Sequence, residues 1–135
     1  MEVHPMPASP APHIYTTTQA PKAIGPYSQA SSAGGLLFIS GQLPIDPQRG
    51  EFASGGIEEH TRQCLNNVTA IAQAAGTDLS RAVKVNLYLT DMGNFERVNR
   101  VYAEYFTGEP PARLAIQVAG LPKNADIEIE AVISL

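Results

Sequence analysis

One arginine stands out among the residues that could do chemistry, because it interrupts a mostly apolar run near the carboxyl end of the chain. Arg113 lies within residues 112–119, ARLAIQVA. A guanidinium group is planar and permanently charged, and it binds a carboxylate through two parallel hydrogen bonds. The competing explanation is an internal Arg–Glu pair, which adds only about 0–1 kcal/mol when exposed and often costs more than it returns when buried. The residues alone leave both explanations open.

Two glutamates are candidate proton acceptors for the same site. Glu128 and Glu130 alternate with isoleucines in DIEIEA, so both side chains point to one face of a strand. At that spacing we expect at most one of them to reach Arg113, and the alternation does not say which. Residues 40–42, Ser-Gly-Gln, interrupt another apolar strand, and the glycine indicates a close approach by a neighbouring group.

Histidine and cysteine do not form a recognisable site. His4, His13 and His60 have no metal-ligand spacing, so we expect no metal and no cofactor. Cys64 falls on the apolar stripe of a predicted helix, which favours a small core residue over a reactive thiol.

Two helices and several strands must position these residues. Small and apolar residues recur every three or four positions from Ile57 to Ala75, and Gly76 follows as a helix terminator. A second helix is predicted to begin at residues 91–94 and to end before Gly108, with an apolar side that runs from Phe95 to Phe106. Strands are predicted in residues 13–18, 28–32, 36–45, 82–91, 112–119 and 126–135.

This order, β-β-β-α-β-α-β-β, predicts an α+β single domain with a mixed β-sheet and two helices packed on one face. We expect the other face to gather the more polar residues and a few apolar ones. These are Arg113, Gln117, Glu128 and Glu130, with Phe38, Ala115, Val132 and Tyr88. A small domain with a half-apolar second face usually buries it against copies of itself, so we predict a homo-oligomer.

Composition limits the class of protein. The chain is 44% hydrophobic and 16% charged, which is typical of a globular domain. Residues 1–13 carry four prolines and are expected to form a flexible extension to a domain spanning 14–135. No apolar run long enough for a membrane span and no secretion signal is evident, so we expect a cytoplasmic protein. A net charge of −4 without a basic cluster argues against nucleic-acid binding.

Three blocks of sequence together resemble one family. APKAIGPYSQA (20–30), FISGQLPIDPQRGE (38–51) and PPARLAIQVAGLPKNADIEIEA (110–131) are similar to the RidA (YjgF-type) family of reactive-intermediate enamine/imine deaminases. The resemblance implies a chorismate-mutase-like fold and a homotrimer with active sites between subunits. It also implies hydrolysis of 2-aminoacrylate and related 2-imino acids, in the manner of a 2-iminobutanoate/2-iminopropanoate deaminase, to 2-oxo acids and ammonia.

The resemblance also implies roles for particular residues. Arg113 would clamp the substrate carboxylate, and Glu128 would orient or deprotonate the attacking water. Tyr27 and Ser40 are implied as polar catalytic groups, either of which could donate or relay a proton to the departing nitrogen. Further substrate contacts are implied for Gly41, Asn99 and Ala115. The family commonly has Ser or Thr and then Cys or Thr after the arginine, where this chain has Leu114 and Ala115, so we expect a roomier, more apolar pocket. The alternatives are a non-catalytic sensor of small acids and a chaperone or translation-inhibitor interaction protein.

Overall fold

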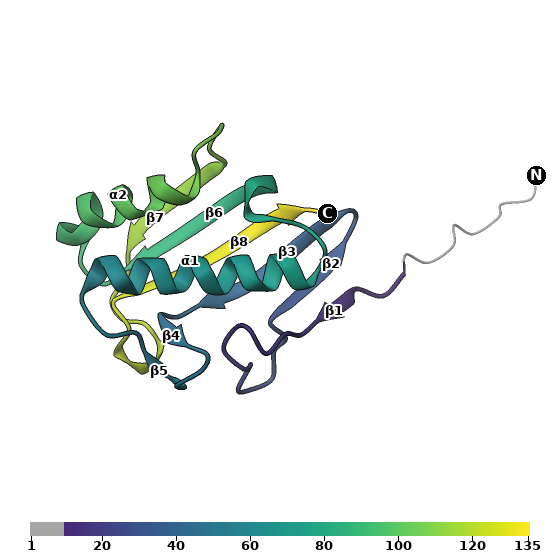
Figure 1. The fold of residues 1–135 in the computed structure, drawn as a ribbon, viewed down its shortest axis with the longest axis horizontal. Coiled ribbons are helices and arrows are strands. Elements are labelled where there is room, and N and C mark those ends of the chain that lie inside the picture. Colours follow the sequence, from purple (N-terminus) through teal and green to yellow (C-terminus); the bar gives the residue numbers. More distant parts are fainter. Residues whose placement is uncertain (1–9) are drawn as a thin grey trace, which may run out of the picture.

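A mixed six-stranded sheet forms the centre of the molecule in the computed structural model, which describes residues 10–135 (Figure 1). The strand order is β1-β2-β3-β8-β6-β7, with β6 and β7 parallel and the other neighbours antiparallel. These strands are β1 (His13–Tyr15), β2 (Ala30–Ala33), β3 (Leu36–Gln42), β6 (Ala82–Leu89), β7 (Ala112–Gln117) and β8 (Ile127–Ser134). A small separate hairpin, β4 (Ile45–Asp46) and β5 (Glu51–Phe52), was not predicted. The predicted order of helices and main strands is confirmed, whereas most of the expected extension lies outside the described residues.

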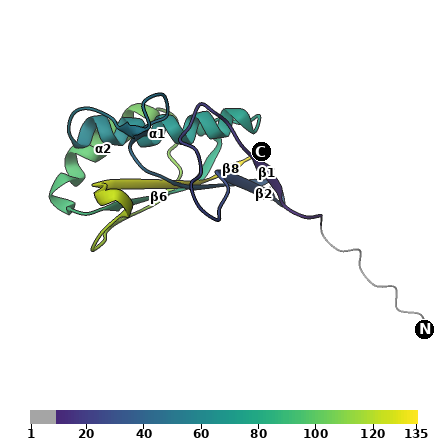
Figure 2. The ribbon, with the colours of Figure 1, turned by 90° about the horizontal axis from the view of Figure 1, so that it is seen from below.

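Both helices cover the same side of the sheet, as predicted (Figure 2). The longer one, α1 (Ile57–Ala74), ends just before Gly76, whose φ of +83° is a conformation that glycine adopts without strain. The shorter one, α2 (Phe95–Tyr105), follows a single 3₁₀ turn that Asp91 caps by accepting a hydrogen bond from the backbone N–H of Gly93. Neither helix is both long and apolar enough to cross a membrane.

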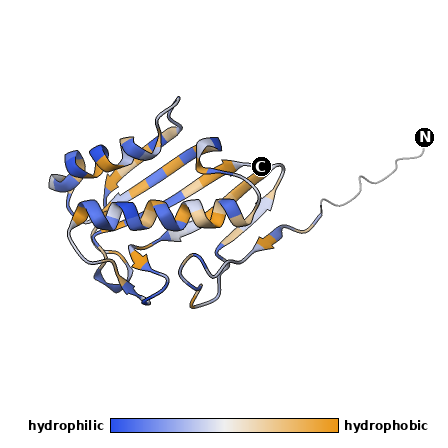
Figure 3. Cartoon of the chain, viewed as in Figure 1, coloured by the Kyte–Doolittle hydropathy of each residue, from blue (hydrophilic) through white to orange (hydrophobic). Residues whose placement is uncertain are grey.

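The core lies between the helices and the sheet. Alternate residues of β8 and β6 point toward α1 and are fully buried, among them Ile129 and Leu87, which are paired across the two strands. This alternation is visible as bands of orange and blue along the strands in Figure 3. Cys64 is buried in this core, which confirms its predicted place. Burial raises the pKa of its thiol well above the usual value.

One prediction about the sheet faces is wrong. The alternation in β7 is as expected, but Arg113 pairs with the buried Val85 and Ala115 pairs with the buried Leu87. Arg113, Ala115 and Gln117 therefore lie on the helix side, whereas Glu128 and Glu130 lie on the other. The physical reason is that β7 is an edge strand, where a long arginine stem covers an aromatic surface while its charged head stays in water.

The side of the sheet without helices, which we call the open face, carries exposed apolar residues. Ile14, Phe38, Leu114 and Ile116 are 52%, 47%, 40% and 38% exposed. The strand register places all four on this face together with the two glutamates. Exposed apolar sets of this kind are typical of surfaces that bind another protein, a membrane or a ligand.

Candidate active site

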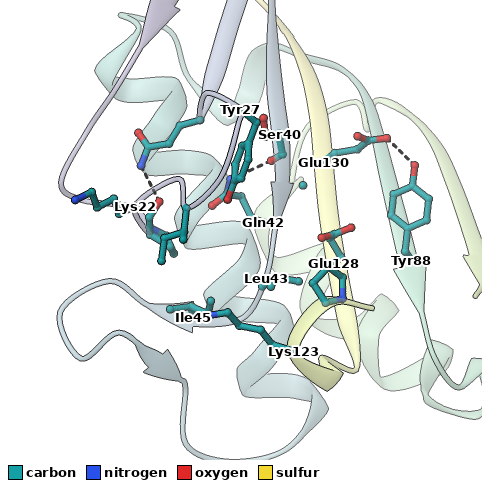
Figure 4. A pocket seen from close by; sticks show the side chains of 15 residues that line it. Lys22, Tyr27, Ser40, Gln42, Leu43, Ile45, Tyr88, Lys123, Glu128 and Glu130 are labelled. Carbon is teal, nitrogen blue, oxygen red and sulfur yellow. Dashed lines mark hydrogen bonds between the residues drawn. The ribbon is translucent and has the colours of Figure 1, made fainter. Parts of the chain in front are cut away.

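A pocket of about 680 Å³ lies where β3 and β8 meet the loop that leads into β2 (Figure 4). It brings together four of the predicted residues, Tyr27, Ser40, Gly41 and Glu128. We call it the glutamate pocket. Its other lining residues are Pro21, Lys22, Ile24, Gln29, Gln42, Leu43, Ile45, Tyr88, Pro122, Lys123 and Glu130.

The carboxyl group of Glu128 lies against the backbone of Gly41. A Cβ atom added at Gly41 would lie 2.8 Å from Cδ of Glu128 and 3.1 Å from its Oε1. A β-bulge sits at this place, because the register between β3 and β8 shifts between Ile39 and Gln42. Bulges of this kind redirect side chains next to active sites. The glycine therefore provides the close approach that the sequence predicted, and its neighbour is the candidate catalytic acid.

Glu128 is the more available of the two glutamates. Within residues 10–135 its carboxyl group forms no hydrogen bond or ion pair, and its side chain is only partly buried. Removal from water, and to a smaller extent the nearby charge of Glu130, raises the pKa of Glu128 above the usual value. A half-buried carboxyl with a raised pKa is suited to accept a proton near neutral pH.

Tyr27 and Ser40 differ in what they can offer a ligand. The hydroxyl of Ser40 donates a hydrogen bond of 2.6 Å to the backbone oxygen of Ser28, so its oxygen is left to accept from a ligand. Tyr27 is 53% exposed and follows Gly25, whose φ of +129° shapes the turn. Of the two side chains, only that of Tyr27 has a hydroxyl proton that no described residue accepts.

Arg113 lies beside a different hollow, of about 440 Å³, on the helix side of the sheet. We call it the arginine hollow. Its lining residues are Asn99, Tyr102, Ala103, Phe106, Pro110, Pro111 and Arg113. Asn99 accepts a 2.7 Å hydrogen bond from Nη1 of Arg113, and both residues were predicted to belong to the site.

Aromatic rings, and no carboxylate, hold the guanidinium group of Arg113. Its Cζ lies 4.9 Å from the ring centre of Tyr102 and 5.3 Å from that of Phe95. No ion pair of Arg113 occurs within the part of the chain that the structure describes. The structure therefore contradicts an internal ion pair with a described glutamate, and the hydrogen bond to Asn99 is the only one that the guanidinium group forms among residues 10–135.

The two hollows hold complementary halves of the predicted site. Arg113 and Asn99 lie on the helix side at one edge of the sheet, and Glu128 with Tyr27 and Ser40 lines the pocket at the other side. The expectation that Arg113 and Glu128 share one face of one subunit is wrong. Within the described part of one chain, the two residues line separate hollows that share no lining residue.

Comparisons with known proteins identify the family. Residues 17–135 match the model of the family described as Endoribonuclease L-PSP. The RutC family protein y4sK of Sinorhizobium fredii is 58% identical over 120 residues, which cover 89% of this chain and 95% of that protein. The human 2-iminobutanoate/2-iminopropanoate deaminase is 47% identical over 119 residues, or 88% of this chain and 87% of that protein. The chain belongs to the RidA (YjgF-type) family.

The fold agrees with this assignment. The crystal structure of RidA from the Antarctic bacterium Psychrobacter sp. matches with a TM-score of 0.87 at 40% identity, covering 91% of this chain and 99% of that one. The two residues after Arg113 differ from those common in the family. In the structure Leu114 lies on the open face, and the side chain of Ala115 packs against the core. Ala115 therefore presents little more than backbone to a ligand.

Sequence reasoning missed Tyr88 as part of the pocket. Its hydroxyl donates a 2.6 Å hydrogen bond to Oε1 of Glu130, as Figure 4 shows. Asn86 donates to the same oxygen at 3.0 Å. The alternation of Asn86 and Tyr88 with buried residues in β6 was a usable signal, since it places both on the face of Glu130.

Proposed function

We propose that this RidA chain hydrolyses 2-imino acids, including the imine tautomer of 2-aminoacrylate, to 2-oxo acids and ammonia. The proposed site forms between two copies of the chain, with the glutamate pocket of one facing the arginine hollow of the other. The observation that carries the proposal is that Arg113 has no ion-pair partner among residues 10–135 while an unpaired Glu128 lines a pocket elsewhere. The deaminase name of the human relative supports the reaction class.

The substrate requires one fixed contact and one proton acceptor. Its carboxylate would bind the planar fork of Arg113, which Asn99 and the aromatic rings orient. This contact would set the position of the imine carbon, and fixed orientation lowers the barrier by removing rotational freedom before reaction. Glu128 would then take a proton from a water molecule whose oxygen attacks that carbon.

With the imine nitrogen protonated at the outset, this attack gives a carbinolamine, which carries a hydroxyl group and an amine on a tetrahedral carbon. Transfer of a proton to the amine, and of the hydroxyl proton to the group that donated it, allows the C–N bond to break, which releases ammonia and leaves the C=O of the 2-oxo acid. Glu128, now protonated, is one candidate donor of this proton, and the hydroxyl of Tyr27 is a second. Ser40 would accept a hydrogen bond from the amine, because its own proton is held by Ser28. No redox change occurs, and water supplies the oxygen atom.

Trapping of the imine tests this proposal directly. An amino-acid oxidase generates 2-imino acids continuously, semicarbazide captures them, and the deaminase lowers the yield of semicarbazone. We expect the wild-type chain to lower this yield in proportion to its concentration and the Arg113→Ala variant to lose the effect. Arg100→Ala removes an exposed arginine from α2 and serves as the matched control. Unchanged trapping at every concentration of wild-type protein would refute the activity.

The Glu128→Gln variant separates an enzyme from a small-acid sensor of the same fold. If the chain is an enzyme, the variant retains binding of a 2-oxo acid and loses turnover that the wild type possesses. If the chain is a sensor, neither protein turns over. The family description names an endoribonuclease, so a ribonuclease assay on highly purified wild type and Arg113→Ala accompanies this test; the net charge of −4 predicts no activity on RNA.

A further inference from the structure

The two glutamates of β8 have different environments although they share a face. Both are partly buried and both line the glutamate pocket. Oε1 of Glu130 accepts hydrogen bonds from Tyr88 at 2.6 Å and from Asn86 at 3.0 Å, whereas Glu128 has neither. The sequence treats them as equivalent, and the structure does not.

We call the two hydrogen bonds that Glu130 accepts from Tyr88 and Asn86 the clamp, and its geometry follows from the strand register. Asn86 lies directly opposite Glu130 across β6 and β8, and Tyr88 lies opposite Glu128. The tyrosine nevertheless leans diagonally, so that its hydroxyl reaches Glu130 instead of its direct neighbour. Diagonal pairs are within reach of long aromatic side chains. Glu128 is consequently left without the donor that its register position would give it.

Asn86 supplies the second hydrogen-bond donor to Glu130. Its Nδ2 donates to Glu130, while its Oδ1 is buried and has no hydrogen-bond partner among residues 10–135. A buried amide oxygen without a partner is costly. The reverse orientation of the amide would bring this oxygen against the carboxylate of Glu130, which is worse. The side chain therefore satisfies Glu130 at the expense of its own carbonyl group.

We infer that Glu130 is a positioning residue, a fixed anion anchored by Tyr88 and Asn86, which acts on the reaction by keeping Glu128 a strong proton acceptor. The effect of Glu130 on the reaction rests on the proposed function. Its effect on the ionisation of Glu128 rests only on the geometry of the clamp. Residues two apart on a strand are separated by roughly 6.6 Å. At this distance the negative charge of Glu130 disfavours ionisation of Glu128. The hydrogen bonds from Tyr88 and Asn86 prevent the Glu130 side chain from rotating to another position.

The tyrosine anchor remains a donor throughout the working pH range. Its hydrogen bond to Glu130, followed by burial and by the charge of Glu130, raises the pKa of Tyr88 to about 12. Tyr88 therefore stays protonated at neutral pH. On the side of β8 that faces the core, burial, followed by the charges of Asp126 and Glu128, raises the pKa of the Cys64 thiol, which therefore stays neutral. The other titratable side chains that line the glutamate pocket are Lys22, Tyr27 and Lys123.

The test measures Glu128 itself as well as the reaction. In full-length protein labelled with ¹³C-glutamate, the carboxyl resonance of Glu128 is assigned by its loss in Glu128→Gln and is titrated with pH. We expect Glu130→Gln to lower the midpoint of Glu128 by about one pH unit, the size of effect that a like charge at this distance exerts. The acid limb of kcat/KM for imine hydrolysis should move down by the same amount.

Matched variants separate tuning from structural damage. Gln at position 130 keeps the shape and still accepts from Tyr88, and circular dichroism checks the fold. Glu130→Asp retains the charge, so the midpoint of Glu128 should fall less than in Glu130→Gln. Glu58→Gln removes one charge on α1, outside the lining of the pocket, and should leave the midpoint of Glu128 unchanged. An unchanged Glu128 midpoint in folded Glu130→Gln overturns the inference. A shifted midpoint in a protein that hydrolyses no imine leaves the clamp intact and rejects the proposed function instead.

Discussion

The separation of Glu128 from Arg113 within one chain leads to a quantitative prediction for mixed assemblies. Arg113→Ala removes the proposed carboxylate-binding group from the arginine hollow, and Glu128→Gln removes the proposed base from the glutamate pocket. Each variant alone should be nearly inactive. When both kinds of subunit assemble together, some sites receive an intact pocket from one chain and an intact hollow from the other, so activity should return.

The expected recovery follows from counting. If subunits mix at random in equal amounts, a site has an intact pocket in half of cases and an intact hollow in half, giving about one quarter of wild-type activity in any closed ring with such an interface. When one variant is three times as abundant as the other, the expected activity falls to about 0.19 of the wild-type value. Mixing wild type with the double variant should likewise leave about one quarter, against about one half if every chain had a complete site.

Co-expression of the two variants with different affinity tags provides the mixed assemblies. The preparation is purified without selecting for both tags, because that selection would remove the unmixed rings that the count includes. Native mass spectrometry, in which the tags differ in mass, establishes that mixed oligomers are present. The trapping assay then gives the recovered rate. Confirmed mixed oligomers with no more activity than the two parents combined would refute the shared site, and so would a wild-type and double-variant mixture at half activity.

Three further predictions concern single features. Because burial and Glu130 raise the pKa of Glu128, the base must lose its proton at a higher pH than an ordinary carboxyl, so kcat/KM should fall as pH drops through this raised value; a limb at the ordinary glutamate pKa would contradict this. Gly41→Ala would place a Cβ 2.8 Å from the carboxyl carbon of Glu128, and we expect the displaced base to cost about a hundredfold in kcat with little loss of thermal stability, measured by the trapping assay and by calorimetry. Leu114→Asp puts a charge on the exposed apolar part of the open face and should dissociate the oligomer in light scattering, whereas Gln73→Asp on α1 should not.

The sequence predicts the elements of this fold well because each has a local signal. The stripe from Ile57 onward and the glycine after it define α1, and the alternation in β8 gives the correct two faces. Alternation gives the period of a strand but not which set faces the core. In β7 the apolar Leu114 and Ile116 face outward, and only pairing with Val85 in β6 reveals that Arg113 faces the helices.

The sequence pointed to four residues that the structure brings together in the glutamate pocket, but it did not give the arrangement of the candidate site. Gly41 indicated a close approach, but the sequence did not show that the approaching group is Glu128. That contact depends on a bulge in the pairing of β3 with β8, which are far apart in the sequence. The two explanations of Arg113 could be separated only by its surroundings, which are the rings of Phe95 and Tyr102. The diagonal reach of Tyr88 depends on a side-chain rotamer, about which residue spacing says nothing.

The contact between Gly41 and Glu128 restricts which substitutions are possible at these two positions. While an acid occupies position 128 in this conformation, a side chain at position 41 would meet it, so we expect the two positions to change together. Once the acid is replaced by a smaller residue, that restriction ends, and position 41 is free to drift. Among descendants of this chain, a side chain at position 41 would therefore mark those that have abandoned the acid.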